Sequence, residues 1–235
     1  MDILTIINRA CTRAKMPSIV SLEDNTNPQA REYLEYANQA VETILRYWDW
    51  RVLAKDWTVI TTDNQLEIPL PEDFGGFLVN QIYDRTRNLY LQNADDDISL
   101  QSRAAKISID IPFWRVLGNN IVFDFPLKAG RQLLMAYKSK YAVITKVDNE
   151  EVSTELFSKN TDTFILNDQA LIAGILAAKS MAYQDTDLQS NQDYFLNILG
   201  ELKEKDGPRR KINIFGRGTN RISPTEYQPY AGDLQ

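Results

Sequence analysis

Histidine is absent from this chain of 235 residues, and cysteine occurs only once, at Cys11. Without an imidazole the chain can form no Ser-His-Asp triad, no Cys-His nucleophile pair and no HExxH zinc site. A single cysteine also excludes an internal disulfide and a cysteine-rich zinc site. Cys11 falls on the apolar face of a predicted helix, so we interpret it as a core residue. These two shortages exclude most of the common catalytic and metal-binding classes.

Long apolar runs are missing as well. No run approaches the roughly 18 residues that a membrane helix needs, and the N-terminal stretch lacks the basic-then-apolar pattern of a secretory signal. We therefore expect a soluble protein, made in a cytoplasm, with no membrane partner. The net charge of −6 argues against a dedicated nucleic-acid-binding protein, which is usually basic.

Neither a GxGxxG motif nor a P-loop occurs, and the acidic residues form no recognisable site. Pairs stand at Glu150/Glu151 and Asp185/Asp187, and a run at Asp95-Asp96-Asp97. Paired carboxylates can cleave glycosides, but these lie in polar stretches without apolar neighbours to raise a pKa. The spacing fits no calcium loop, and the run of three suits a helix N-terminus. We predict no catalytic residue, no metal ligand and no cofactor.

Apolar residues at helical spacing predict four helices. The first covers Asp2 to Lys15, and Asn27-Pro28 is a strong start signal for a second helix that runs to about Tyr47. A helical hairpin covers Asn167 to Lys205, with Asn167 or Asp168 as its cap. The aromatic cluster that closes the second helix, residues 47–50, is interpreted as a hinge between helical and β layers rather than as a ligand platform.

From Arg51 the apolar period falls to about two, which indicates strands. The expected strands lie at 52–54, 57–61, 65–69, 77–84, 89–92, 113–117, 121–125 and 133–141, with a brief helix at 98–105. The polar stretch 145–164 is predicted to be a long surface loop. The fold class expected is α+β: a helical bundle from residues 1–50 and 165–207, an inserted antiparallel β module over 51–144, and an extended arm over 208–235.

The C-terminal arm, residues 208–235, differs in charge from the rest of the chain. It has five cationic side chains against two carboxylates, so it is net +3, whereas the other residues sum to −9. It is either a disordered terminus or an arm that docks on a partner. In the second interpretation apolar anchors and charge-assisted contacts come from Arg209, Arg210, Ile212, Ile214, Phe215, Arg217, Arg221, Tyr227 and Tyr230.

Several stretches carry a family resemblance. They are MDILTIINRACTRAKMPSIVSL, YWDWRVLAKD, LEIPLPEDF, QIYDRTRNLYL, LLMAYKSKYAV and TDTFILNDQALIAGILAAKSMAYQDTDLQSNQDYFLNILGELKEKDG. In this order, over nearly the whole chain, they resemble the head-to-tail adaptor (head-completion) proteins of tailed phages, especially short-tailed ones. The motifs are structural: a Pro-x-x-Phe turn and a Tyr-Asp-Arg strand end. The chain departs from many relatives where Ala177-Ala178 stands in place of Trp.

The resemblance implies a virion protein assembled in the host cytoplasm. It would form a ring, commonly of twelve copies, beneath the portal protein of the DNA-filled head. The ring would extend the DNA channel without binding DNA specifically and hold the tail nozzle or tail hub protein. The arm would reach the portal, and the small residues Ala173, Gly174, Ala177 and Ala178 would pack against the next subunit of the ring.

Two other functions remain open. One is a virion-associated peptidoglycan hydrolase, because some relatives have been credited with that activity; the absence of histidine and of a pocketed acid pair counts against it. The other is a client-binding assembly module whose arm captures a partner protein. Ring formation separates this module from the adaptor.

Overall fold

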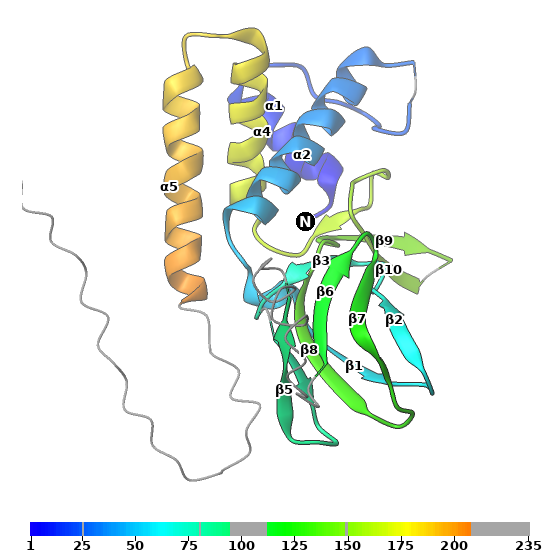
Figure 1. Cartoon of the computed structure of the whole chain (residues 1–235). Helices are drawn as coiled ribbons and strands as arrows, with labels where there is room; N and C mark the ends of the chain where they lie inside the picture. The colour runs from blue at the N-terminus through cyan, green and yellow to red at the C-terminus, as the bar shows by residue number, and fades with distance from the viewer. Residues whose placement is uncertain (25, 80, 95–111, 149, 208–235) are drawn as a thin grey trace, which may run out of the picture.

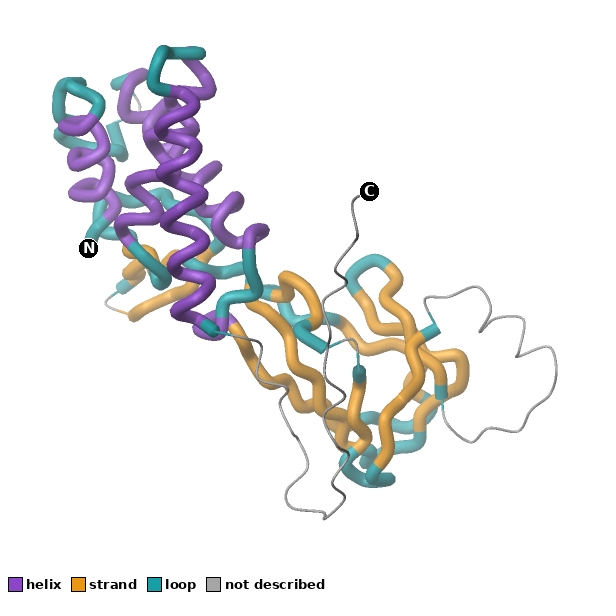
Figure 2. The backbone as a smooth tube through the Cα atoms, turned by 90° about the vertical axis from the view of Figure 1, so that its left-hand side faces the viewer, coloured by secondary structure: helices purple, strands orange, loops and turns teal. Residues whose placement is uncertain are grey.

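A computed structural model describes residues 1–24, 26–79, 81–94, 112–148 and 150–207. Figure 1 shows four helices gathered above a curled sheet, and Figure 2 shows the helices at one end of the molecule and most strands at the other. The described helices are α1 (Ile3–Arg13), α2 (Pro28–Tyr47), α4 (Asp168–Tyr183) and α5 (Leu188–Asp206). None of these described helices is long and apolar enough to cross a membrane.

The helices begin where the sequence predicts. The Asp2 carboxylate accepts a hydrogen bond from the Thr5 amide at 2.7 Å, and Asn27 caps α2 with proline in the first turn. Asn167 caps α4 by accepting from the Ala170 amide at 3.0 Å. Each cap satisfies an amide that the helix itself leaves without a partner. The start signals at Asn27-Pro28 and at Asn167 are therefore confirmed.

Helix α4 is the centre of the helical part. Every residue from Ala170 to Ala177 is buried, because α1 and α2 lie on one side of α4 and α5 on the other. The same core also contains Val143 and Phe164, which belong to the smaller of the two sheets described below. The helical core is thus completed by strand residues.

The larger sheet has eight strands. They are β1 (Ala54–Ile60), β2 (Gln65–Pro69), β3 (Phe74–Phe77), β4 (Ile82–Asp84), β5 (Leu89–Asn93), β6 (Phe113–Leu117), β7 (Asn120–Leu127) and β8 (Gln132–Ser139). The order is β1-β8-β4-β5-β6-β7-β2, with β3 also on β8. All pairs are antiparallel except β5 with β6. The sheet curls around a core of its own, in which Trp114, Ile82 and Leu133 are fully buried.

A smaller sheet joins the two parts. It consists of β9 (Val143–Val147), β10 (Glu150–Thr154) and β11 (Thr163–Phe164), in the order β10-β9-β11. Its β11 edge is tied to the N-terminus, because the Ile3 amide donates to the Asp162 carbonyl at 2.8 Å and Asp2 bridges to Thr163.

The predicted fold class is wrong. The chain is a mixed α+β protein dominated by the curled eight-stranded sheet, with only four helices in its described part, and not a helical bundle carrying an inserted β module. The sequence undercounts the strands because short ones give weak periodicity. The range 77–84 holds the end of β3 and all of β4, and residues 52 and 53 belong to a 3-10 turn, with Ala54 beginning β1. The sheet closes on its own apolar core, which makes it a principal element.

The stretch 145–164, predicted as a loop, also differs. It contains the end of β9, all of β10, and β11. All but the last residue of β10 are exposed, so neither face of the strand shows the apolar alternation by which strands are recognised. The brief helix at 98–105 and the carboxylates Asp95, Asp96 and Asp97 lie outside the described residues.

Candidate functional site

The candidate catalytic groups do not converge. Glu150 and Glu151 are exposed neighbours on β10, and adjacent residues of a strand point to opposite faces. The Asp185 carboxylate accepts from the Ser180 hydroxyl at 3.2 Å and from the Asp187 amide at 3.2 Å. Asp185 therefore shapes the turn between α4 and α5.

The described residues also provide no cluster suited to metal binding or nucleophilic catalysis. Among the described residues no group of three or more His, Cys, Asp or Glu side chains could hold a metal ion. Cys11 is fully buried in the helical core, and burial raises the pKa of its thiol. A buried thiol with a raised pKa is a core side chain rather than a nucleophile.

The Pro-x-x-Phe motif forms a turn that fixes the rim of the large sheet. The Phe74 amide donates to the Pro71 carbonyl at 3.0 Å. Between them, the Asp73 carboxylate accepts from Lys55, from Tyr137 at 2.8 Å and from Ser139 at 2.9 Å. Burial alone would raise the pKa of Asp73, but the three hydrogen bonds outweigh it and hold the pKa below its usual value.

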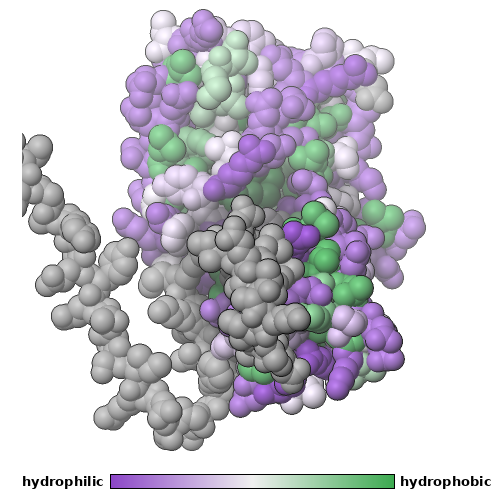
Figure 3. All heavy atoms as spheres, in the orientation of Figure 1, coloured by the Kyte–Doolittle hydropathy of each residue, from purple (hydrophilic) through white to green (hydrophobic). Residues whose placement is uncertain are grey.

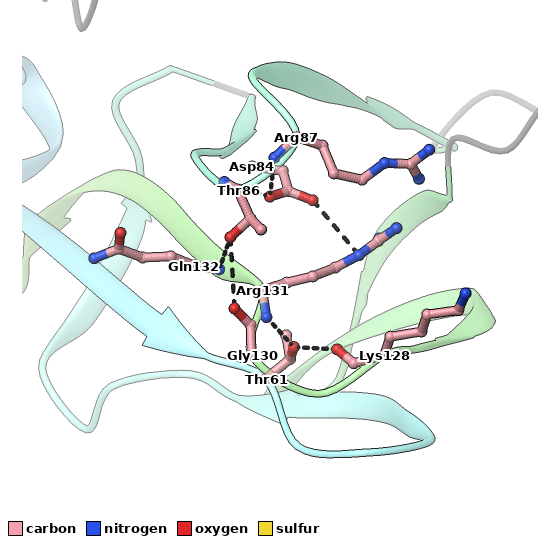
Figure 4. A network of polar contacts seen from close by, with 8 residues as sticks. All are labelled: Thr61, Asp84, Thr86, Arg87, Lys128, Gly130, Arg131 and Gln132. Carbon is pink, nitrogen blue, oxygen red and sulfur yellow. Dashed lines mark hydrogen bonds and ion pairs between the residues drawn. The ribbon is translucent and has the colours of Figure 1, made fainter.

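The Tyr-Asp-Arg strand end supplies a buried carboxylate. Asp84 is fully buried, and its Oδ1 accepts from the amides of Thr86 at 2.9 Å and Arg87 at 3.1 Å. Its Oδ2 lies 3.6 Å from Nε of Arg131, which follows the β7–β8 turn (Figure 4). The Thr61 hydroxyl donates to the Lys128 carbonyl at 2.6 Å and accepts from the Arg131 amide at 3.1 Å. This network holds together three loops at the end of the sheet.

The aromatic cluster after α2 joins the helical and β parts. The Trp50 indole donates to the Ile44 carbonyl at 2.8 Å, and the Trp48 indole donates to Asp206 at the end of α5 at 3.1 Å. Lys138 of β8 donates to the Leu45 carbonyl at 3.1 Å. The two indoles thus tie the cluster to the helical part, and Lys138 links β8 to the end of α2 beside it.

The small residues of α4 lie against their own chain. Ala173, Gly174 and Ala177 are buried, and a Cβ built on Gly174 would lie 2.7 Å from Cβ of Ala40 in α2. Ala178 is only half-buried. It lines a shallow groove of about 290 Å³ between α2, α4 and α5, whose other apolar lining includes the exposed side chains of Met181 and Leu196.

The surface has no single dominant apolar patch on the face drawn in Figure 3, where hydrophobic residues emerge at several separate places. The C-terminal arm, with all of its predicted portal-binding residues, lies outside the described residues. The candidate site of the described part is therefore a set of surfaces rather than a pocket.

Comparison with known families decides the class of protein. A family described as SU10 adaptor protein matches residues 1–217. The chain belongs to the SU10 adaptor family. An SU10 adaptor has a structural role in the phage virion, where it associates with portal and tail components. No curated protein sequence matches the chain.

Sequence reasoning missed two features of this SU10 adaptor. It did not find the buried pair Asp84–Arg131, because the two residues are far apart in the chain and only the closure of β4 on β8 joins them. It also did not find the exposed strand β10, whose polar residues resemble a loop. The doublet Asp148-Asn149 was the available signal, since Asp and Asn both favour turns.

Proposed function

We propose that this SU10 adaptor forms a ring, of twelve copies by family analogy, beneath the portal of a short-tailed phage. The ring extends the DNA channel and provides the platform for the tail nozzle or tail hub. The family match over residues 1–217 is the observation that carries the proposal. The absence of a convergent catalytic or metal-binding group in the described part of the chain supports a structural role.

Charge distribution supports passage of DNA without binding. Residues 1–207 carry a net charge of −9, whereas the whole chain carries −6. A negative wall repels phosphates, whereas cationic contacts would hold them and slow transit. The acidic body is therefore suited to a channel that DNA must leave quickly.

The arm, residues 208–235, is the proposed contact to the portal. It carries the opposite net charge to the body, and a ring of identical arms binds a symmetric partner with a high effective concentration. The contacts that we propose are those of Arg209, Arg210, Ile212, Ile214, Phe215, Arg217, Arg221, Tyr227 and Tyr230.

Neighbouring subunits are proposed to meet at the groove between α2, α4 and α5. Since Ala173, Gly174 and Ala177 are buried within the chain, a neighbour reaches this region through Ala178 and the exposed side chains of Met181 and Leu196.

Electron microscopy of the protein mixed with its cognate portal tests the proposal. We expect monomers or weak assemblies from the protein alone and a ring on one face of the portal in the mixture. A portal without added density, at protein concentrations well above those of the portal, would refute the adaptor ring.

A further inference from the structure

Strand β10 is an edge strand with an open side. Among the described residues it pairs only with β9, in the register Glu150↔Val147 through Thr154↔Val143. Alternate residues of an antiparallel strand direct their N–H and C=O groups to opposite sides, so part of the β10 backbone points away from β9. Such an edge is a ready template for another strand.

The side chains of this edge are acidic at one end and apolar further along. Asp148, Glu150 and Glu151 are all exposed. Val152 of β10 and Val147 of β9 are 43% and 41% exposed. The register places both valines on one face of the hairpin. A partner strand that fits this edge therefore carries cations first and an apolar residue next.

The root of the arm has this pattern. Residues 210–214 read Arg-Lys-Ile-Asn-Ile, and residues 150–154 of β10 read Glu-Glu-Val-Ser-Thr. In a parallel alignment, two cations stand opposite Glu150 and Glu151, Ile212 stands opposite Val152, and the polar Asn213 stands opposite Ser153. An antiparallel alignment that kept Ile212 opposite Val152 would place Ile214 opposite Glu150. Complementary cross-strand pairs favour the parallel arrangement.

We propose that residues 210–214 of one copy add as a parallel strand to β10 of a neighbouring copy. This contact uses strand addition, in which backbone hydrogen bonds supply affinity and alternate side chains supply specificity. It deepens the proposed ring by assigning a subunit contact. Of the arm residues proposed above for the portal, it reassigns Arg210, Ile212 and Ile214 to the neighbouring copy and leaves Arg209, Phe215, Arg217, Arg221, Tyr227 and Tyr230 for the portal.

The position of α5 favours a strand that comes from another copy. The C-terminal end of α5 is fixed near the α2 end, because Asp206 accepts from the Trp48 indole at 3.1 Å. Figure 1 shows α5 on one side of the molecule and β10 projecting from the other, with α2 and α4 between them. Only residues 208 and 209 separate Gly207 from Arg210, and three chain steps span at most about 11 Å. The arm therefore leaves α5 on the side of the molecule opposite to β10 of its own chain.

Disulfide mapping between separately prepared variants tests the proposal. Val152→Cys protein is mixed with Ile212→Cys protein, and, as the matched control, with Asn213→Cys protein; both mixtures are mildly oxidised with and without the cognate portal. Same-face neighbours on paired strands lie about 5 Å apart, within reach of a disulfide, whereas residue 213 would face the opposite side. We expect a linked dimer from the first mixture at a yield about tenfold above the control. Native Cys11 is buried and should remain unreacted.

Equal yields from the two mixtures would overturn the strand pairing. A disulfide between Val152→Cys and a cysteine added to the portal chain would also overturn it, because β10 would then contact the portal. The two proposals fail separately. If the unmodified protein forms no ring on the portal, the ring is refuted. Strand pairing is then still measured by the disulfide yield in concentrated protein without the portal. If rings form but residue 152 never links to residue 212, only the strand pairing is refuted.

Charge reversal gives an independent readout in the full chain. Glu150→Lys with Glu151→Lys, or Arg210→Glu with Lys211→Glu, should weaken self-association about tenfold in sedimentation experiments, because like charges then face each other. The fourfold variant restores opposite charges and should recover the unmodified association. A fourfold variant as weak as either pair alone would overturn the register.

Discussion

Gly174 of α4 lies so close to α2 that a Cβ at this position would be 2.7 Å from Cβ of Ala40. The same Cβ would also lie 3.2 Å from the Phe195 ring of α5. The three helices thus meet at one residue without a side chain. This contact fixes the distance between α2 and the C-terminal hairpin, and with it the groove beside Ala178.

Gly174→Ala is expected to destabilise the fold. Real Cβ atoms do not approach to 2.7 Å, so α2 and α4 must separate, and overpacking of this kind costs about 1–3 kcal/mol. The better helix propensity of alanine offsets about 1 kcal/mol of that loss. We expect urea unfolding to show a net loss of up to about 2 kcal/mol.

Two matched variants control this measurement. Gly200→Ala in α5 has open space around the new Cβ, so it should gain up to about 1 kcal/mol. Ala40→Gly combined with Gly174→Ala removes the clash and should recover most of the loss. Equal effects of Gly174→Ala and Gly200→Ala would show that the close approach is not a constraint.

Arg131→Met should destabilise the large sheet by about 3 kcal/mol, because it leaves the buried Asp84 carboxylate without its counter-charge. Asp84→Asn with Arg131→Met removes both charges and should lose less than Arg131→Met alone. The exposed Arg85 is the control, and Arg85→Met should change stability by about 0.5 kcal/mol or less. Additive single-variant effects in a double-mutant cycle would contradict the coupling.

Asp73→Asn should make stability less dependent on pH in the acid range. The folded-state pKa of Asp73 lies below its ordinary value of 3.8. The folded state therefore favours the ionised form, and this stabilisation is complete above the unfolded pKa and lost as the pH falls through the folded pKa.

We expect Asp73→Asn to cost about 1–2 kcal/mol at neutral pH, and the difference from the unmodified protein to shrink below about pH 4. Thermal unfolding from pH 7 to pH 2 measures both. The exposed neighbour Glu72, changed to Gln, should leave the profile unchanged. A constant difference between Asp73→Asn and the parent across this range would contradict the role of the ionised carboxylate.

Deletion of residues 208–235 should abolish portal binding and leave the melting temperature within about 2 °C of the parent. The reason is that both apolar cores of the described part are built from residues that precede the arm. Calorimetry and portal pull-down check the two effects. A large drop in melting temperature would instead mean that the arm packs into the core.

Peptidoglycan in a zymogram should remain intact at the 27.0 kDa position of the protein. Glu150 and Glu151 are exposed neighbours that point to opposite faces of β10. Lysozyme in a parallel lane shows that the gel detects hydrolysis. A cleared band for the SU10 adaptor, abolished by a single carboxylate substitution, would establish an enzyme.

Local signals predicted the helices well. Asn27 and Asn167 are caps, and a cap depends only on a side chain and the amides two or three residues later. The hairpin of α4 and α5 follows from helical periodicity, which is also local. The exposed strand β10 was missed because nothing in its own residues distinguishes it from a loop; its pairing partner, β9, defines it.

The sequence by itself determined the exclusions and the charge division: without histidine there is no imidazole chemistry, and a cationic arm follows an acidic body. It also determined the family, through motifs spread along nearly the whole chain. The tertiary structure decided that the sheet dominates, that Asp84 meets Arg131, and that the small residues of α4 face α2 and α5 of the same chain. These outcomes depend on contacts between residues far apart in sequence, whose free energy arises only when the strands and helices pack together.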